Sequence, residues 1–300
     1  MMTQLQYDNE MINIFKSEVR AQELSIQNYE TLQSFKFCES LPISTLMLQS
    51  CENIRFGRVP SNITKLIINQ CNLLNIYGIQ HMNLKYLDLN VNLIHDTDCL
   101  GQILSLNELS LQANCISDIS PLSTLTNLQS LSLLGNKVNN IQPLSFLINL
   151  ERLNLSRNEV EDLSPLRSLV SLIDVNLSFN KIWNIDPLQK LNVQKLVLSN
   201  NKIVDINSLS ENLREVYLRS NQIVHVKPLA SMTQIQYLDI AVNPIVDDQS
   251  LDEHQYRQNF YVDYIFTPST KQVFRIKLYA TNSRQVKVAD EHKKPTSQNS

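Results

Sequence analysis

The sequence predicts an α/β repeat solenoid: a right-handed horseshoe with a parallel sheet on its concave face and short 3-10 or helical turns on its convex face. Three observations support this fold. Asparagine recurs at a nearly constant spacing, an apolar-x-apolar phrase precedes each asparagine, and a proline-leucine pair follows many of them. The ladder asparagines are Asn92, Asn114, Asn136, Asn158, Asn180, Asn201, Asn221 and Asn243, at steps of 22, 22, 22, 22, 21, 20 and 22 residues. Such a period is typical of units that stack and bury one another's apolar edges.

A short strand is predicted just before each ladder residue. Before Asn136, for example, Leu131 and Leu133 flank a polar residue, which is the period of a strand with one buried face. Weaker copies of the phrase end at Cys51 and Cys71, and a degenerate copy ends at Tyr29. The chain is therefore expected to contain about eleven strands.

The ladder asparagines are expected to be structural. The chain bends where it leaves each strand, so backbone N–H and C=O groups there need partners. An amide side chain is both donor and acceptor, so stacked copies can bond the backbone of adjacent repeats. These residues are therefore predicted to hold the repeats together and not to form a binding site.

A proline marks the convex turn of many repeats. The motifs are Ser120-Pro121-Leu122, Ser164-Pro165-Leu166 and Asp186-Pro187-Leu188. Ser or Asp is expected to be the N-cap and Pro the first helical position, where its missing N–H loses no hydrogen bond. Few residues remain in each repeat, so a single turn of 3-10 or α-helix is expected.

The two ends of the chain differ from its middle. Met11, Phe15 and Val19 lie four apart on one helical face, which predicts an N-terminal helical cap over residues 1–23. Repeats are expected over residues 24–245 and a C-terminal cap over 246–266. Residues 267–300 hold seven Lys or Arg against two Asp or Glu, so this basic, partly disordered tail carries +5. Alternation over residues 273–278 allows one extra strand.

Composition excludes several classes of function. The net charge of −3 gives no basic stripe for nucleic acid, and no stretch is apolar enough to cross a membrane. The N-terminus does not resemble a secretory signal. The five cysteines include no C-x-x-C pair, so free thiols in a reducing compartment are expected. A cytoplasmic monomer is predicted, with a nuclear location also allowed.

No catalytic or metal motif is found in the sequence. The five histidines are scattered, and neither a glycine-rich phosphate loop nor a Gly-x-Ser-x-Gly turn occurs. The run His95-Asp96-Thr97-Asp98-Cys99 is the densest in ligand-type residues, but it falls in a turn where Asp and Thr serve as caps. The chain is therefore expected to be neither an enzyme nor a metal protein, and to use no cofactor.

The repeats resemble those of leucine-rich repeat proteins of the 22-residue type. The phrase from Ile116 to Leu122, followed by Leu125 and Leu128, is similar to repeats of internalins and of type-1 protein phosphatase regulatory subunits. The resemblance covers about residues 24–245 and implies a leucine-rich repeat horseshoe. Asn243-Pro244-Ile245, with Tyr256-Arg257 and Val262, is similar to the cap of intracellular eukaryotic members, and the match ends at Asp263.

The concave face is the predicted partner-binding surface. Its exposed positions lie six, four and two residues before each ladder residue and form a first, a middle and a last row. Arg152, Asp174, Lys195 and Glu215 alternate in sign along the first row, at salt-bridge range. They form either a self-neutralised structural ladder or a charged docking row.

Tyr and Arg are the residue types that most often supply interface hot spots. The cluster of Tyr217, Arg219 and Tyr237 is therefore a candidate for the main contact, and the alternative is that these are ordinary surface residues, since some tyrosine is expected on any concave face. The candidate partner-binding residues are Tyr86, Asp88, Arg152, Asp174, Tyr217, Arg219, Tyr237 and Asp239.

The predicted function is a non-catalytic scaffold or adaptor that binds a protein partner on its concave face. The resemblance also allows a regulatory subunit of type-1 protein phosphatase. A third alternative is a secreted or surface adhesin of the internalin type, which would need a targeting signal.

Overall fold

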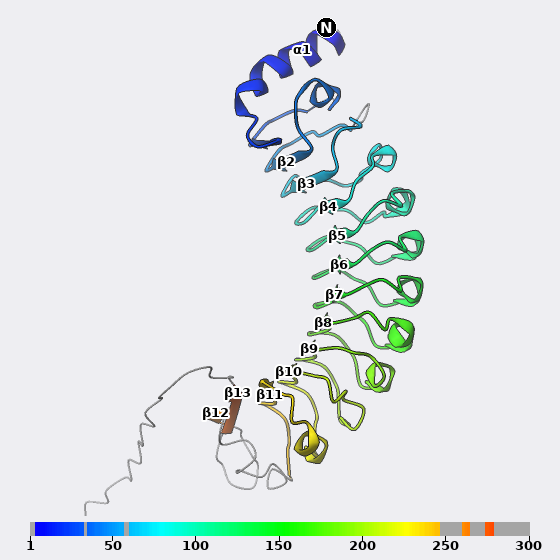
Figure 1. Ribbon diagram of the computed structural model, residues 1–300, viewed down its shortest axis with the longest axis vertical. Helices are drawn as coiled ribbons and strands as arrows, with labels where there is room; N and C mark the ends of the chain where they lie inside the picture. Colours follow the sequence, from blue (N-terminus) through cyan, green and yellow to red (C-terminus); the bar gives the residue numbers. More distant parts are fainter. Residues whose placement is uncertain (1–3, 33–34, 57–59, 247–259, 265–273, 279–300) are drawn as a thin grey trace, which may run out of the picture.

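The computed structural model describes residues 4–32, 35–56, 60–246, 260–264 and 274–278, and within them the predicted solenoid is confirmed. One open sheet contains eleven parallel strands, each paired with the next in chain order. Figure 1 shows them along the inner side of a curved body. The strands are β1 (Glu23–Gln27), β2 (Thr45–Gln49), β3 (Lys65–Asn69), β4 (Tyr86–Asp88), β5 (Glu108–Ser110), β6 (Ser130–Ser132), β7 (Arg152–Asn154), β8 (Asp174–Asn176), β9 (Lys195–Val197), β10 (Glu215–Tyr217) and β11 (Tyr237–Asp239).

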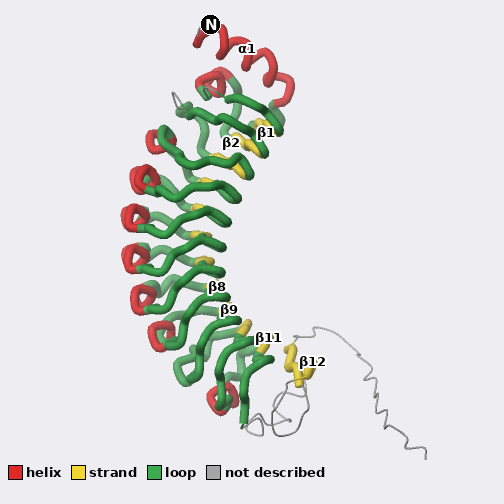
Figure 2. The backbone as a smooth tube through the Cα atoms, turned by 180° about the vertical axis from the view of Figure 1, so that it is seen from behind, coloured by secondary structure: helices red, strands yellow, loops and turns green. Residues whose placement is uncertain are grey.

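Short 3-10 helices form the convex side, as predicted (Figure 2). Five of them have proline in their first positions, where the absent N–H leaves no bond unmade. The convex elements are η2 (Lys36–Ser40), η3 (Ile79–His81), η4 (Asp98–Gln102), η5 (Ser120–Thr124), η6 (Gln142–Phe146), η7 (Ser164–Ser168), η8 (Asp186–Leu188) and η9 (Lys227–Ser231).

The predicted N-caps were wrong by one residue. Ser120 and Ser164 are already inside their 3-10 helices, and Asp186 likewise opens η8. The capping acceptor comes from two residues earlier. Asp118 Oδ1 accepts the Ser120 N–H at 2.8 Å, and an equivalent acceptor two residues earlier serves Ser164 and Asp186. A carboxylate or amide at this distance forms the local side-chain-to-backbone bond that Asp and Asn favour in turns.

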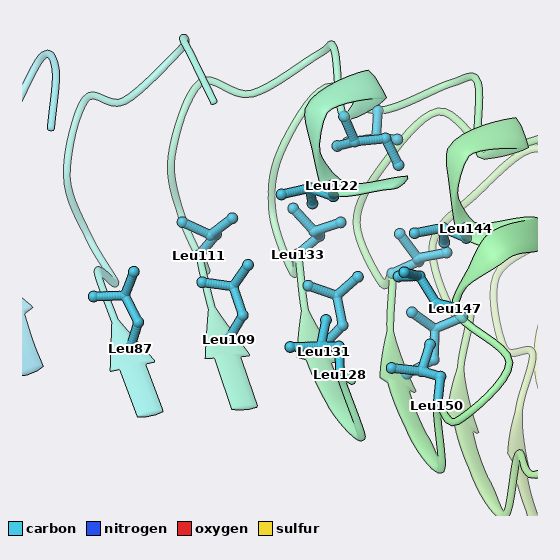
Figure 3. Packing of buried hydrophobic residues seen from close by; sticks show 14 of the residues in the cluster. Leu87, Leu109, Leu111, Leu122, Leu128, Leu131, Leu133, Leu144, Leu147 and Leu150 are labelled. Carbon is cyan, nitrogen blue, oxygen red and sulfur yellow. The ribbon is translucent and has the colours of Figure 1, made fainter. Parts of the chain in front are cut away.

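Leucine side chains from every repeat form one continuous core (Figure 3). Leu131 and Leu133 point inward from β6 and the residues after it, and meet Leu122 and Leu144 from the convex turns. These side chains are at most 1% exposed. Complete burial of one leucine contributes about 1.5–3 kcal/mol, so the repeated pattern accounts for stacking.

The ladder asparagines bond adjacent repeats, as predicted. Asn158 Nδ2 donates to Leu133 O of the preceding repeat at 2.9 Å and to Leu155 O at 3.0 Å. Its Oδ1 accepts the N–H of Val138 at 3.0 Å. One side chain therefore satisfies buried backbone groups on both sides of a repeat boundary.

The residue before each ladder position is left-handed, which the sequence pattern did not indicate. Its φ is 56° at Val91, Arg157 and Phe179, and 68° at Gly135. This conformation turns the chain sharply out of the strand. Non-glycine residues adopt it at a cost of about 1–2 kcal/mol, which the ladder bonds that follow offset.

At the N-terminal end, α1 (Gln4–Phe15) and η1 (Lys16–Glu18) lie over the first repeats (Figure 1). Met11 and Phe15 are buried, and the Phe15 ring lies 5.7 Å from the rings of Tyr29 and Phe37. Val19 follows η1 and packs on the core from outside the helix, although the sequence suggested one helical face for all three residues.

At the C-terminal end, β12 (Phe260–Tyr264) pairs antiparallel with β13 (Phe274–Leu278), and β13 lies beside β11. The extra strand allowed over residues 273–278 is therefore present. Tyr256, Arg257 and most of the basic tail lie outside the described residues. The division into two caps, repeats and tail stays a prediction. Among the described residues, every helix is too short or too polar to span a bilayer.

Candidate functional site

The sheet aligns the first and middle rows in register across successive strands. Neighbouring first-row residues are Cα partners from Lys65 through Tyr86 to Tyr237. The middle row is aligned in the same way, from Ile67 beside Asp88 to Tyr217 beside Asp239. Strands about 4.8 Å apart bring these side chains within reach of their neighbours.

The last row is less exposed than predicted. Ser156 is 4% exposed, Ser178 7% and Ala241 3%. The Ser156 and Ser178 hydroxyls also donate to Asn154 and Asn176 of their own repeats, at 2.7 and 2.8 Å. These short side chains bond back to their own strands and expose little area, so the central part of the accessible face has two rows and not three.

Tyr86 and Asp88 form an N-terminal group on the sheet. Lys65 Nζ lies 4.8 Å from the centre of the Tyr86 ring, which is cation–π range. Asp88 Oδ1 accepts the Asn90 N–H at 3.1 Å, while partial burial raises the pKa of the Asp88 carboxyl. The sequence-based choice missed Lys65, although extending the first row by one repeat would have found it.

Arg152 and Asp174 lie side by side in the centre of the face, but they do not form the predicted ion pair. Arg152 Nη1 bonds Glu151 Oε2 at 3.2 Å instead, within its own strand region. Burial is the main cause of a raised pKa at Asp174, and Lys195 and Arg152 oppose it. The alternating-charge ladder therefore forms in part: among the described residues, its one ion pair is Lys195–Glu215 at 3.2 Å.

Tyr217 and Tyr237 form an aromatic pair near the C-terminal end. Their ring centres are 4.5 Å apart at an interplanar angle of 30°. Tyr217 Oη donates to Glu215 Oε2 at 3.2 Å, and Lys195 Nζ lies 6.0 Å from the centre of the Tyr217 ring. Lys195 and Glu215 therefore belong to this group, although the sequence-based choice left them out.

Arg219 and Asp239 adjoin the aromatic pair. Both are partly buried, and Asp239 Oδ1 accepts the Ala241 N–H at 3.1 Å. A guanidinium, a carboxylate and two phenol rings are thus presented from β10, β11 and the second residue after β10. The group combines aromatic area with both signs of charge, which are the properties of an interface hot spot.

The eight predicted residues do not form one cluster. They fall into an N-terminal, a central and a C-terminal group. Tyr86 and Tyr237 are separated by seven strand-to-strand steps, which corresponds to about 34 Å. A partner that contacts all eight would have to cover most of the sheet, whereas a smaller one would contact a single group.

The candidate metal run has local structural roles. Asp96 accepts bonds from the Asp98 N–H and from the Tyr77 hydroxyl, and Thr97 Oγ1 donates to Asp118 O at 3.1 Å. The bond from Tyr77 is the main cause of a lowered pKa at Asp96. Across the part of the chain that the structure describes, no three His, Cys, Asp or Glu side chains converge on a metal position.

Comparisons with known proteins agree with this architecture. A family model of leucine-rich repeats in two copies matches residues 104–147 and 148–190. Comparison with curated proteins finds no sequence match.

Three solved structures illustrate the similarity. The internalin InlF of Listeria monocytogenes is 26% identical, with a TM-score of 0.63 over 81% of this chain and 65% of that one. Internalin C2 of the same organism is 28% identical, with a TM-score of 0.52 over 64% of this chain and 76% of that one. The plant peptide hormone receptor RGFR1, solved in complex with RGF2, is 19% identical and has a TM-score of 0.53, over 75% of this chain and 36% of that one.

This chain thus spans just under two thirds of the InlF structure. The repeat spacing, the open parallel sheet and the matches to the family model and to InlF show that the chain is a leucine-rich repeat protein.

Proposed function

We propose that this protein is a non-catalytic scaffold or adaptor that binds another protein on its concave face. Leucine-rich repeat domains generally bind proteins, and similar structures include a receptor solved with its peptide hormone. The observation that carries the proposal is the C-terminal group on the sheet, where the tilted ring pair of Tyr217 and Tyr237 lies beside the ion pair of Lys195 and Glu215.

This group supports the proposal because its side chains can contribute binding energy without refolding. The ring contact between Tyr217 and Tyr237 and the hydroxyl bond to Glu215 restrict the rotamers before a partner arrives. Less conformational entropy is then lost on binding. Truncating hot-spot aromatic or arginine side chains commonly weakens binding by about 2 kcal/mol or more.

The test is photocrosslinking in native lysate with a benzophenone amino acid placed at Tyr217. The matched control carries the same amino acid at Phe146, an aromatic residue on the convex side that is 58% exposed. We expect discrete crosslinked proteins at position 217 and none of them at 146. In a separate affinity capture without crosslinker, the double variant Tyr217→Ala/Arg219→Ala should no longer retain the proteins that the unmodified chain retains, while its far-ultraviolet circular dichroism stays unchanged.

Equal crosslinking at both positions, or full capture by the double variant, would contradict the proposal. Two more specific functions, a regulatory subunit of type-1 phosphatase and an adhesin of the internalin type, can then be distinguished by experiment. Retention of purified type-1 phosphatase on the immobilised protein at low salt would support the regulatory-subunit version, and its absence would remove that version. The similarity to internalins motivates the adhesin version, which requires that the protein be recovered outside the cell.

A cytoplasmic location is part of the proposal. All five cysteines are free, and four of them are buried, so none forms a disulfide in this fold. Such thiols are usual in a reducing compartment. Fractionation of cells that express a tagged full chain tests this point, and recovery only in the medium would contradict it.

A further inference from the structure

We propose that a hollow beside Trp183, on the flank between the sheet and the convex turns, binds an extended segment of a partner protein in which a basic residue adjoins an apolar one. The hollow has a volume of about 650 Å³ and is lined by residues of successive repeats, including Asn139, Glu161 and Trp183. These three residues each lie three positions after a ladder asparagine. The surface is therefore separate from the concave rows.

Trp183 is the only tryptophan of the chain and is 58% exposed. The same position holds Val204 and Val246, which are 50% and 66% exposed, with the partly buried Val224 between them. Backbone bonds keep these repeats in register, as in Lys202 N–H to Ile182 O at 2.8 Å. An apolar ridge thus runs from the hollow toward the C-terminal end.

The other wall of the hollow is acidic. It contains Glu159, Glu161, Asp162 and Lys181, so three negative charges against one positive charge leave −2. Lys181 Nζ pairs with Glu159 Oε2 at 2.8 Å, and the Asp162 carboxylate accepts the N–H and hydroxyl of Ser164. Glu161 has no ion-pair or hydrogen-bond partner among the described residues. It is the carboxylate that an incoming cation can bind without breaking another contact.

An extended peptide fits this arrangement better than an anionic ligand. The carboxylates repel phosphate groups, and an arginine can bond a carboxylate with two parallel N–H groups. Two repeat steps separate Glu161 from Val204, or about 10 Å, which an extended chain crosses in roughly three residues. An arginine over Glu161 therefore places a nearby apolar side chain on Trp183 or Val204.

The experiment uses random linear heptapeptides displayed on phage and selected on the full chain, with counter-selection on the bare support only. Enriched peptides should share a Lys or Arg next to an aromatic or branched apolar residue. A synthetic copy that contains no tryptophan should shift the emission of Trp183, which is then the only indole in the sample. By labelled-peptide anisotropy, Trp183→Ala should weaken binding about 30-fold, as expected for a tryptophan hot spot. Glu161→Lys should weaken it at least about tenfold.

Phe146→Ala is the matched control, because Phe146 has the same 58% exposure as Trp183 but lies outside the hollow. It should leave binding unchanged, and so should Tyr217→Ala on the concave face. The proposal is overturned by failure to enrich any peptide, by enriched peptides without a basic residue, or by binding that survives Trp183→Ala. Circular dichroism on each variant identifies a loss of binding that comes from unfolding.

Discussion

The ladder residue of each repeat, called a rung below, bonds the backbone of the neighbouring repeat. The rungs near the N-terminus are the thiols of Cys51 and Cys71, and those over the rest of the solenoid are asparagine amides. Cys71 Sγ accepts the Cys51 N–H at 3.3 Å and donates to Asn69 O at 3.2 Å and Leu48 O at 3.9 Å. Asn158 makes the corresponding bonds at 2.9–3.2 Å. A side chain at the ladder position therefore bonds the adjacent repeat whether it is a thiol or an amide. The type of side chain sets the strength of those hydrogen bonds.

The strands differ between the same regions. Each of β1, β2 and β3 has five residues, whereas each of β4 to β11 has three. Longer strands add backbone hydrogen bonds where the rungs are weaker thiols. Helix α1 also covers this end, so the N-terminal repeats depend less on any one rung than the central repeats do.

The largest expected effect is the loss of a central amide rung. Asn158→Ala leaves the Val138 N–H and three carbonyls without their side-chain partner, at a position that is 8% exposed. We expect unfolding free energy to fall by about 3–4 kcal/mol, measured by urea denaturation. The exposed Asn139→Ala is the control. A loss below 1 kcal/mol would show that the ladder is dispensable.

Two glycines, Gly78 near the N-terminal end and Gly135 in the central repeats, offer a second comparison of the two regions. Gly78 has φ +110°, and an added Cβ would lie 2.8 Å from Phe56 Cβ, so Gly78→Ala should cost about 2–3 kcal/mol. Gly135 has φ +68° with its nearest neighbour at 3.8 Å, and Arg157 and Phe179 adopt this conformation in later repeats. Gly135→Ala should cost about 1 kcal/mol. Thermal unfolding of both variants measures the difference, and equal losses would argue against the clash.

Cys71→Ala should cost less than Asn158→Ala. The sulfur bonds are long and weak, so we expect about 1–2 kcal/mol, mostly from the Cys51 N–H left without an acceptor. The measurement is urea denaturation under reducing conditions. If both variants lose the same free energy, thiol and amide rungs are equivalent and the contrast between the two regions fails.

Alkaline pH should weaken the thiol-bearing region. Burial raises the pKa of Cys71 and Cys99 from 9.0 to about 11, so the folded chain holds these protons more tightly than the unfolded chain. Their contribution is complete below pH 9 and is lost as pH rises toward 11. We expect about 1 kcal/mol per thiol between pH 8 and 10. Cys99→Ala should reduce the slope of unfolding free energy against pH in this range. An unchanged slope would show that groups other than Cys99 cause the pH dependence.

The smallest effect is expected for the surface ion pair Lys195–Glu215, both of whose side chains are at least 40% exposed. A double-mutant cycle with Lys195→Ala and Glu215→Ala should give a coupling of about 0.5 kcal/mol that decreases with salt. A coupling of about 3 kcal/mol, as large as the loss expected for a buried amide, would show that the charged row stabilises the fold.

Structural roles were predicted correctly where one residue type recurs with the repeat. They were predicted wrongly where two nearby side chains compete for the same hydrogen-bond partner. The Asn158 rung and the strand before it follow directly from the period. The cap at Asp118 was assigned to Ser120, because Ser-Pro is the stronger helix-start signal while the carboxylate two residues earlier reaches the N–H first. The left-handed Val91 and Phe179 carry no turn signal in their residue types.

The candidate site was predictable in register but not in its contacts. First-row alignment from Tyr86 to Tyr237 follows from the spacing of the ladder. The partner of Arg152 does not, because Glu151, the residue just before β7, competes with Asp174 across the sheet. The extent of the C-terminal group also required the structure, which adds Lys195 and Glu215 to the two tyrosines.

The sequence by itself determined the solenoid, its eleven strands and the set of buried leucines, because a repeated unit has the same apolar edges and one way to bury them. The structure decided which surface charges pair, which residues of the last row are buried, and that Trp183 borders a hollow next to Glu161. Those features arise between repeats, where conformation and the choice among nearby partners depend on distances of an ångström. A one-dimensional pattern holds no such distances.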